Sequence, residues 1–120
     1  PLKEGNFLRA AAEIMADDVA DSKGRERQVL DKAISMLQSA MLSGRESREA
    51  VEALYFIRRV WVAFIDDLRS PENQLPLNLR ADLISIGIWV LKEAERIRTR
   101  QSNNFQGIAD VITIIRDGLK

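Results

Sequence analysis

The stretch ADLISIGIWVLKEAERIR, from Ala81 to Arg98, carries the widest helical pattern in the chain. At about 100° per residue, its apolar side chains cover an arc of about 200° around the helix axis. We expect the rest of the chain to fold around this helix, which should contact at least two others because one neighbour cannot cover so wide an arc. The apolar positions are Leu83, Ile84, Ile86, Ile88, Val90, Leu91, Ala94 and Ile97, with Leu79 one turn upstream.

Two residues within this stretch depart from the pattern. Gly87 lies near the middle of the apolar arc, where the absence of a side chain lets a second helix approach closely. This close packing is expected to offset its helix-propensity cost of about 1 kcal/mol relative to alanine. Trp89 falls on the polar side, beside Asp82 and Glu93. Its indole either packs under a neighbouring segment of this chain or anchors a partner protein.

The remaining helices follow from apolar stripes and their boundary residues. A helix from Lys23 to Leu42 has one apolar face and stops before a glycine. A third helix runs from the N-cap Ser47 to Arg69 and ends at the prolines of the SPENQLP connection, in which Leu75 and Leu77 should hold the loop onto the bundle. Asn103 or Asn104 caps a last helix, which Gly118 ends.

The fold class predicted is all-α, and no segment shows the alternation of a strand. We expect residues 1–120 to form a single domain, a compact bundle of four main helices plus a short N-terminal helix from Phe7 to Val19. The stripe of that N-terminal helix is thin and rich in alanine, so residues 1–20 are expected to be loosely attached.

Within the third helix, two residues lie on the wrong side. Phe56 falls on the polar side, whereas Arg58 lies between the apolar residues Val51, Tyr55 and Val62. Phe56 is either covered within the molecule or contacts a partner. Arg58 extends past its apolar neighbours, caps a carboxylate of this chain, or binds an anion. The candidate partner contacts are Trp89, Phe56 and Tyr55, with Arg58 and Arg96 at the rim.

Composition narrows the classes of function. The chain has 18 Lys and Arg against 18 Asp and Glu, and this neutral balance makes direct nucleic-acid binding an unfavoured role. It contains no histidine and no cysteine, the usual general base, metal ligands and thiol nucleophile. We therefore expect no enzyme and no catalytic, cofactor or metal site. No apolar run approaches the ~20 residues of a membrane-spanning helix and no secretory signal is visible, so we expect a cytoplasmic protein without a membrane partner.

The middle of the chain resembles a known family. From Ser47 it reads SREAVEALYFIRRVWVAFIDDLRSPENQLPLNLRADLISIGIWVLKEAERI, with DLRSPENQLP and LRADLISIGIWV as its most specific parts. This region, together with RERQVLDKAISML before it and IIRDGL near the end, resembles the FlaF family of flagellar biosynthesis regulators and flagellin chaperones of alphaproteobacteria. The opening PLKEGNFLRAA departs from the family pattern, so we expect residues 1–11 to be a lineage variation or not native.

The resemblance implies a cytoplasmic regulator that works with flagellin and promotes its production or export, in balance with a second regulator of flagellin translation. Such a protein is expected to be a secretion chaperone that binds unassembled flagellin, whose amphipathic terminal helices suit a groove between helices. Two alternatives stay open. One is a post-transcriptional regulator acting on flagellin messenger RNA or on its translational repressor. The other is a helical adaptor for another regulatory protein.

Overall fold

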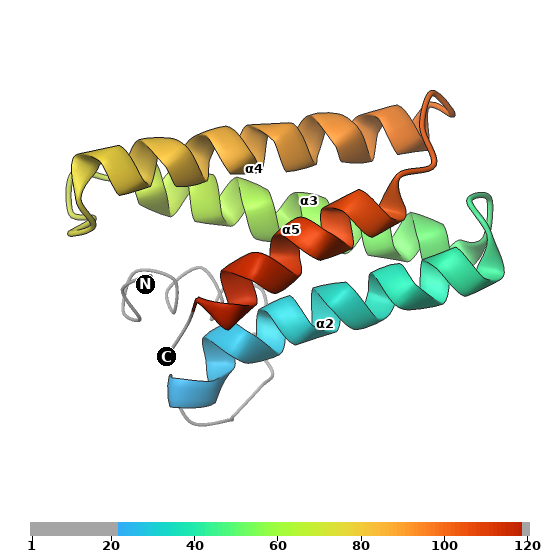
Figure 1. The fold of residues 1–120 in the computed structure, drawn as a ribbon, viewed down its shortest axis with the longest axis horizontal. Coiled ribbons are helices and arrows are strands. Elements are labelled where there is room, and N and C mark those ends of the chain that lie inside the picture. The colour runs from blue at the N-terminus through green and yellow to red at the C-terminus, as the bar shows by residue number, and fades with distance from the viewer. Residues whose placement is uncertain (1–21, 119–120) are drawn as a thin grey trace.

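The computed structural model describes residues 22–118, which form four helices and no strand, so the all-α prediction is confirmed (Figure 1). The expected helix from Phe7 to Val19 lies outside the described residues. The helices are α2 (Ser22–Ser43), α3 (Arg48–Arg69), α4 (Leu77–Arg98) and α5 (Phe105–Asp117).

The four described helices form a closed ring in which each one contacts two neighbours. α3 packs against α2 and α4, while α5 packs against α2 and, over a smaller area, against α4. Figure 1 shows α3 and α4 side by side and antiparallel, because residues 70–76 turn the chain back on itself. The expected contact of α4 with two other helices is therefore confirmed.

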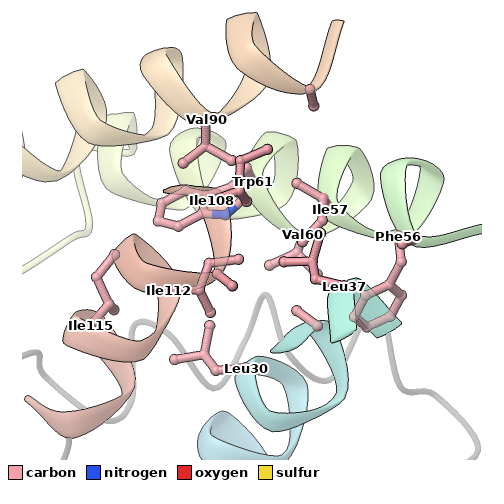
Figure 2. Packing of buried hydrophobic residues seen from close by; sticks show 14 of the residues in the cluster. Leu30, Leu37, Phe56, Ile57, Val60, Trp61, Val90, Ile108, Ile112 and Ile115 are labelled. Atoms are coloured by element: carbon pink, nitrogen blue, oxygen red, sulfur yellow. The ribbon is translucent and has the colours of Figure 1, made fainter. Parts of the chain in front are cut away.

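The core is centred on α3 and not, as predicted, on the stretch from Ala81 to Arg98. α3 buries nine residues, whereas α4 buries six. Trp61 of α3 is fully buried, and Figure 2 shows it beside Val90 of α4 and Ile108 of α5. α3 takes this position because α2 and α4 cover it from two sides, while α5 covers only a small part of α4.

The buried strip of α4 is accordingly narrower than its apolar arc. Val90 is fully buried and marks the middle of this strip. Ile86 is only partly buried, and Ile88 is 43% exposed. The apolar arc is wider than the buried strip because an apolar pattern shows only which side chains can be buried. The neighbouring helices decide which of these side chains are buried in the folded protein.

Helix boundaries follow from local hydrogen bonds. The Ser47 hydroxyl accepts from the N–H of Ala50 at 3.0 Å, which confirms the predicted cap of α3. The Asn104 side chain caps α5 in the same way, with the N–H of Gly107 donating at 3.0 Å. α4 begins directly after Pro76, upstream of the stretch that starts at Ala81 and of Leu79. Pro76 is its N-cap, and the Pro76 carbonyl accepts from the N–H of Arg80 at 2.9 Å as the first hydrogen bond of the helix.

The connection of residues 70–76 is held by a buried asparagine. The Asn73 side-chain amide donates to the backbone carbonyl of Asp67 at 3.1 Å, and its carbonyl accepts from the N–H of Leu75 at 3.0 Å. Leu75 is buried as predicted, whereas Leu77 is 75% exposed, so only one of the two leucines holds the loop onto the bundle.

Gly87 lies where α4 packs closely on α3, as its place in the sequence predicts. A Cβ atom built on Gly87 would lie 2.9 Å from Cδ1 of Ile65 and 3.0 Å from Cε3 of Trp61. The isoleucine terminus can rotate away, but the indole is fixed in the core. The absent side chain therefore sets the distance between the two helices.

We expect the Gly87→Ala variant to be less stable than the native protein, although alanine favours a helix by about 1 kcal/mol. Crowding the Trp61 ring costs about 1–3 kcal/mol, which exceeds this gain. Urea unfolding measures the difference. Ser85→Ala, at an exposed position of the same helix, is the matched control and should be neutral or stabilising. A Gly87→Ala variant as stable as the control would show that the helices can separate freely.

Candidate functional site

An open groove lies between the first half of α3 and the second half of α4, with a volume of about 430 Å³. We call it the α3–α4 groove. Its floor is made of Leu54, Leu91, Ala94 and Ile97, its α3 wall of Val51 and Tyr55, and its charged rim of Arg45, Glu46, Arg58, Glu95, Arg98 and Arg100.

The apolar wall of the groove is open to solvent. Val51 is 63% exposed and Tyr55 is 64% exposed, although both are large apolar side chains. The same face continues along the two helices at helical spacing, with Val62 on α3 and Ile88 on α4 exposed by 40% and 43%. A continuous exposed apolar surface of this kind is typical of a binding site for another protein.

The rim carries more positive than negative charge, with four arginines against two glutamates. Both glutamates are already paired: Arg98 binds Glu95, and Arg100 binds Glu46 at 2.8 Å. Hydrogen bonds from Arg98 lower the pKa of Glu95, and the positive charge of Arg58 contributes to the same shift. Arg58 on α3 and Glu95 on α4 thus line the same groove from its two sides.

Arg100 closes the C-terminal end of α4 in an uncommon conformation. Its φ of 67° lies in the left-handed region, where glycine is usual. The N–H of Gln101 donates to the carbonyl of Arg96 at 2.8 Å, which completes the helix end. Through its ion pair with Glu46, Arg100 joins this end of α4 to the connection between α2 and α3.

The structure brings two of the five predicted contact residues together. Tyr55 and Arg58 both line the α3–α4 groove. Trp89 is 41% exposed, but it precedes Leu91 by two residues and so lies about 160° around α4 from the groove. Arg96 is committed to the turn between α4 and α5, where it pairs with Glu93 at 2.8 Å.

Phe56 is buried, although its helical angle places it on the polar side of α3. Only 7% of it is exposed, and Nζ of Lys32 on α2 lies 5.0 Å from the centre of its ring. Of its two open interpretations, cover within the molecule is the one that the structure shows. The helical angle misplaced Phe56 because α3 packs on α2 as well as on α4, which widens its buried side.

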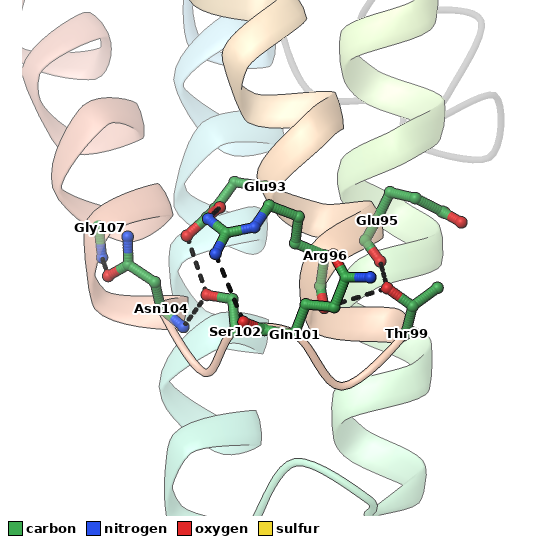
Figure 3. Close-up of polar contacts among 8 residues, drawn as sticks. All are labelled: Glu93, Glu95, Arg96, Thr99, Gln101, Ser102, Asn104 and Gly107. Atoms are coloured by element: carbon green, nitrogen blue, oxygen red, sulfur yellow. Dashed lines mark hydrogen bonds and ion pairs between the residues drawn. The ribbon is translucent and has the colours of Figure 1, made fainter.

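Glu93 was also expected on the polar side and is instead buried, with only 5% exposed (Figure 3). The Ser102 hydroxyl donates to one of its carboxylate oxygens at 2.9 Å, and Arg96 donates to the other at 2.8 Å. The N–H of Asn104 in turn donates to the Ser102 hydroxyl at 3.1 Å. Glu93 thus joins α4 to the start of α5, which is a structural role.

The Glu93→Gln variant should reduce the pH dependence of folding stability. Burial raises the pKa of Glu93, but hydrogen bonds from Ser102 and Asn104 and the charge of Arg96 outweigh it, so the pKa lies below its ordinary 4.5. Because the pKa is lower in the folded than in the unfolded state, the ionised carboxylate stabilises the fold above pH 4.5. This stabilisation is lost as the pH falls through the pKa of Glu93 in the folded state.

Urea unfolding of native and Glu93→Gln protein, at neutral pH and at a pH below 4.5, tests this linkage. The native protein should lose more stability on acidification than the variant does. Equal losses would show that the buried carboxylate does not contribute to acid sensitivity.

Residues 22–118 offer neither a metal site nor a membrane span. No group of three or more acidic side chains there is arranged to hold a metal ion. None of the described helices combines the length and the apolar character needed to cross a lipid bilayer.

Comparison with known proteins identifies the family. No curated protein and no solved structure matches the chain. A family model described as "Flagellar protein FlaF" matches residues 9–119, which include all four described helices and both walls of the α3–α4 groove. This chain is therefore a member of the FlaF family of flagellar proteins.

Proposed function

We propose that this protein is a cytoplasmic flagellin chaperone, which acts by binding and not by catalysis. Membership of a flagellar family points to the flagellum as its setting. The observation that carries the proposal is the α3–α4 groove, whose wall exposes Val51 and Tyr55 above a floor of buried and partly buried apolar side chains. In this function the groove holds an amphipathic terminal helix of unassembled flagellin.

The shape of the groove suits a helix as the ligand. From Val51 to Val62 its exposed face runs for about 16 Å along α3, at 1.5 Å per residue. A partner helix of about three turns spans this length and presents apolar side chains at positions i, i+3 or i+4, and i+7. The antiparallel helices α3 and α4 would then pack against the partner as they pack against each other.

Covering such a helix prevents premature polymerisation, since the apolar faces of flagellin's terminal helices are the surfaces that drive assembly. A subunit held in this way stays unassembled until export. The chaperone thereby links the supply of flagellin to its secretion, which accounts for a regulatory effect on flagellin production without a direct contact with RNA.

Calorimetric titration of two variants with monomeric flagellin tests the location of the site. Tyr55→Ala removes an exposed aromatic ring from the groove and should weaken binding by about 2 kcal/mol, or about 30-fold in Kd. Trp89→Ala is the matched control, because it removes an exposed ring from the far side of α4. It should leave Kd nearly unchanged.

Weaker binding by Trp89→Ala together with an unchanged Kd for Tyr55→Ala would place the partner on the Trp89 side of α4. That result would contradict the groove as the binding site. Absence of flagellin binding to the native protein would contradict the chaperone function itself. In that case, steeply salt-dependent binding of flagellin leader RNA by the protein alone would favour the post-transcriptional role. Capture of a regulatory protein from cells that lack flagellin would favour the adaptor role.

A further inference from the structure

We infer that the α3–α4 groove selects amphipathic helices that carry acidic side chains beside their apolar stripe, and that Arg58 recognises these side chains by pairing with a carboxylate. The inference rests on the proposed function, because it requires that the groove binds a helix. It adds a recognition rule for the partner: aspartate or glutamate next to the apolar anchors.

The first argument is the balance of charge around the groove. The whole chain has equal numbers of basic and acidic residues, so its formal net charge is zero. The groove has four arginines and two glutamates, and those glutamates already bind Arg98 and Arg100. Within residues 22–118, Arg45 and Arg58 form no hydrogen bond and no ion pair. A carboxylate from the partner can therefore pair with either of them without breaking an existing contact.

The second argument is the position of Arg58. It is an exposed residue in the middle of the apolar face, between Tyr55 and Val62. A helix that covers this face removes water from the guanidinium as well as from its apolar neighbours. A covered arginine without a partner is strongly unfavourable, whereas one paired with a carboxylate through two hydrogen bonds is not.

Discrimination follows from the same position. A partner helix with lysine or only apolar residues opposite Arg58 would bury an unpaired cation and bind weakly, even if its apolar stripe fits. Arg45 supplies a second unpaired cation at the end of the groove next to the α2–α3 connection. The apolar floor of the groove therefore provides affinity, and Arg45 and Arg58 provide specificity for helices with acidic side chains.

Two designed peptides test the rule with the full-length protein. Both carry the same three-turn apolar stripe, one flanked by glutamates and the other by lysines. The native protein should bind the glutamate peptide at least about tenfold more tightly, and this preference should shrink as salt is raised. In the Arg58→Glu variant the preference should disappear or reverse. Arg69→Glu, an exposed arginine three turns further along α3, is the matched control and should keep the native preference.

The possible failures of this inference and of the proposed function give different results. Equal binding of the two peptides, or an unchanged preference in Arg58→Glu, overturns the charge rule. If the native protein binds flagellin but neither peptide, the rule is overturned and the chaperone function stands. If it prefers the glutamate peptide but does not bind flagellin, the rule stands and flagellin is not the partner.

Discussion

Replacing Trp61 by alanine is expected to lower the free energy of unfolding by about 3–5 kcal/mol, which is a large part of the 5–15 kcal/mol typical of a whole domain. The indole is fully buried in the core, and its ring centre lies 5.3 Å from that of Phe64. Its removal leaves a cavity that touches α3, α4 and α5, because helices fixed by their other contacts cannot close around it.

Urea or thermal unfolding measures this effect, and the second tryptophan of the chain provides the control. Trp89 is 41% exposed, so Trp89→Ala should change stability by less than about 1 kcal/mol. Trp61→Phe keeps most of the packing and removes a buried indole N–H that finds no hydrogen-bond partner among residues 22–118, so it should cost less than Trp61→Ala. Similar losses in the two alanine variants would contradict the position of the core.

An aspartate at position 90 is expected to destabilise the domain by about 4 kcal/mol or more, and to leave much of it unfolded at neutral pH. Val90 is 0% exposed and faces α3 and α5 from the middle of the buried strip of α4 (Figure 2). A carboxylate there is removed from water into the hydrophobic cluster of the core, and the apolar contacts of the valine are lost as well.

Circular dichroism and urea unfolding of Val90→Asp test this prediction, with Ile88→Asp as the control. Ile88 lies two residues earlier and is 43% exposed, so its variant should keep the native helical content and most of its stability. A folded Val90→Asp protein beside an unfolded Ile88→Asp protein would show that α4 is rotated about its axis relative to the structure described above.

The parts of the fold predicted best are those that local chemistry decides. The N-caps Ser47 and Asn104 act on backbone groups within their own first turn, so their effect can be recognised without knowledge of the packing. Gly87 was also interpreted correctly, because a glycine in the middle of an apolar arc favours the close approach of a neighbouring helix. The start of α4 is less easily predicted, because a proline that breaks one helix can also stand at the N-cap of the next, as Pro76 does.

The errors arise where distant segments decide burial. Phe56 and Glu93 were both placed on polar sides by their helical angle. Phe56 is covered by α2, and Glu93 is covered by the turn that carries Ser102. In both cases the covering segment is far away in the sequence or lies after a change of chain direction, so a pattern within one helix cannot reveal it.

The sequence carries one signal of the groove, which is the position of Arg58. Arg58 is a charge between Val51, Tyr55 and Val62, which identifies a mixed face but not whether that face is buried or open. The structure leaves it open, because α4 packs on the neighbouring side of α3. Trp89 is a large aromatic residue on the polar side of its helix, but it lies on a different side of α4 from the groove.

The most direct test of the proposed function is a calorimetric titration of the native protein with monomeric flagellin and with flagellin that lacks its terminal helices. A chaperone that holds a terminal helix in the α3–α4 groove is expected to bind the intact subunit tightly and to lose this binding on truncation. Equal binding of the two forms would contradict recognition of a terminal helix, and binding of neither would contradict the chaperone function.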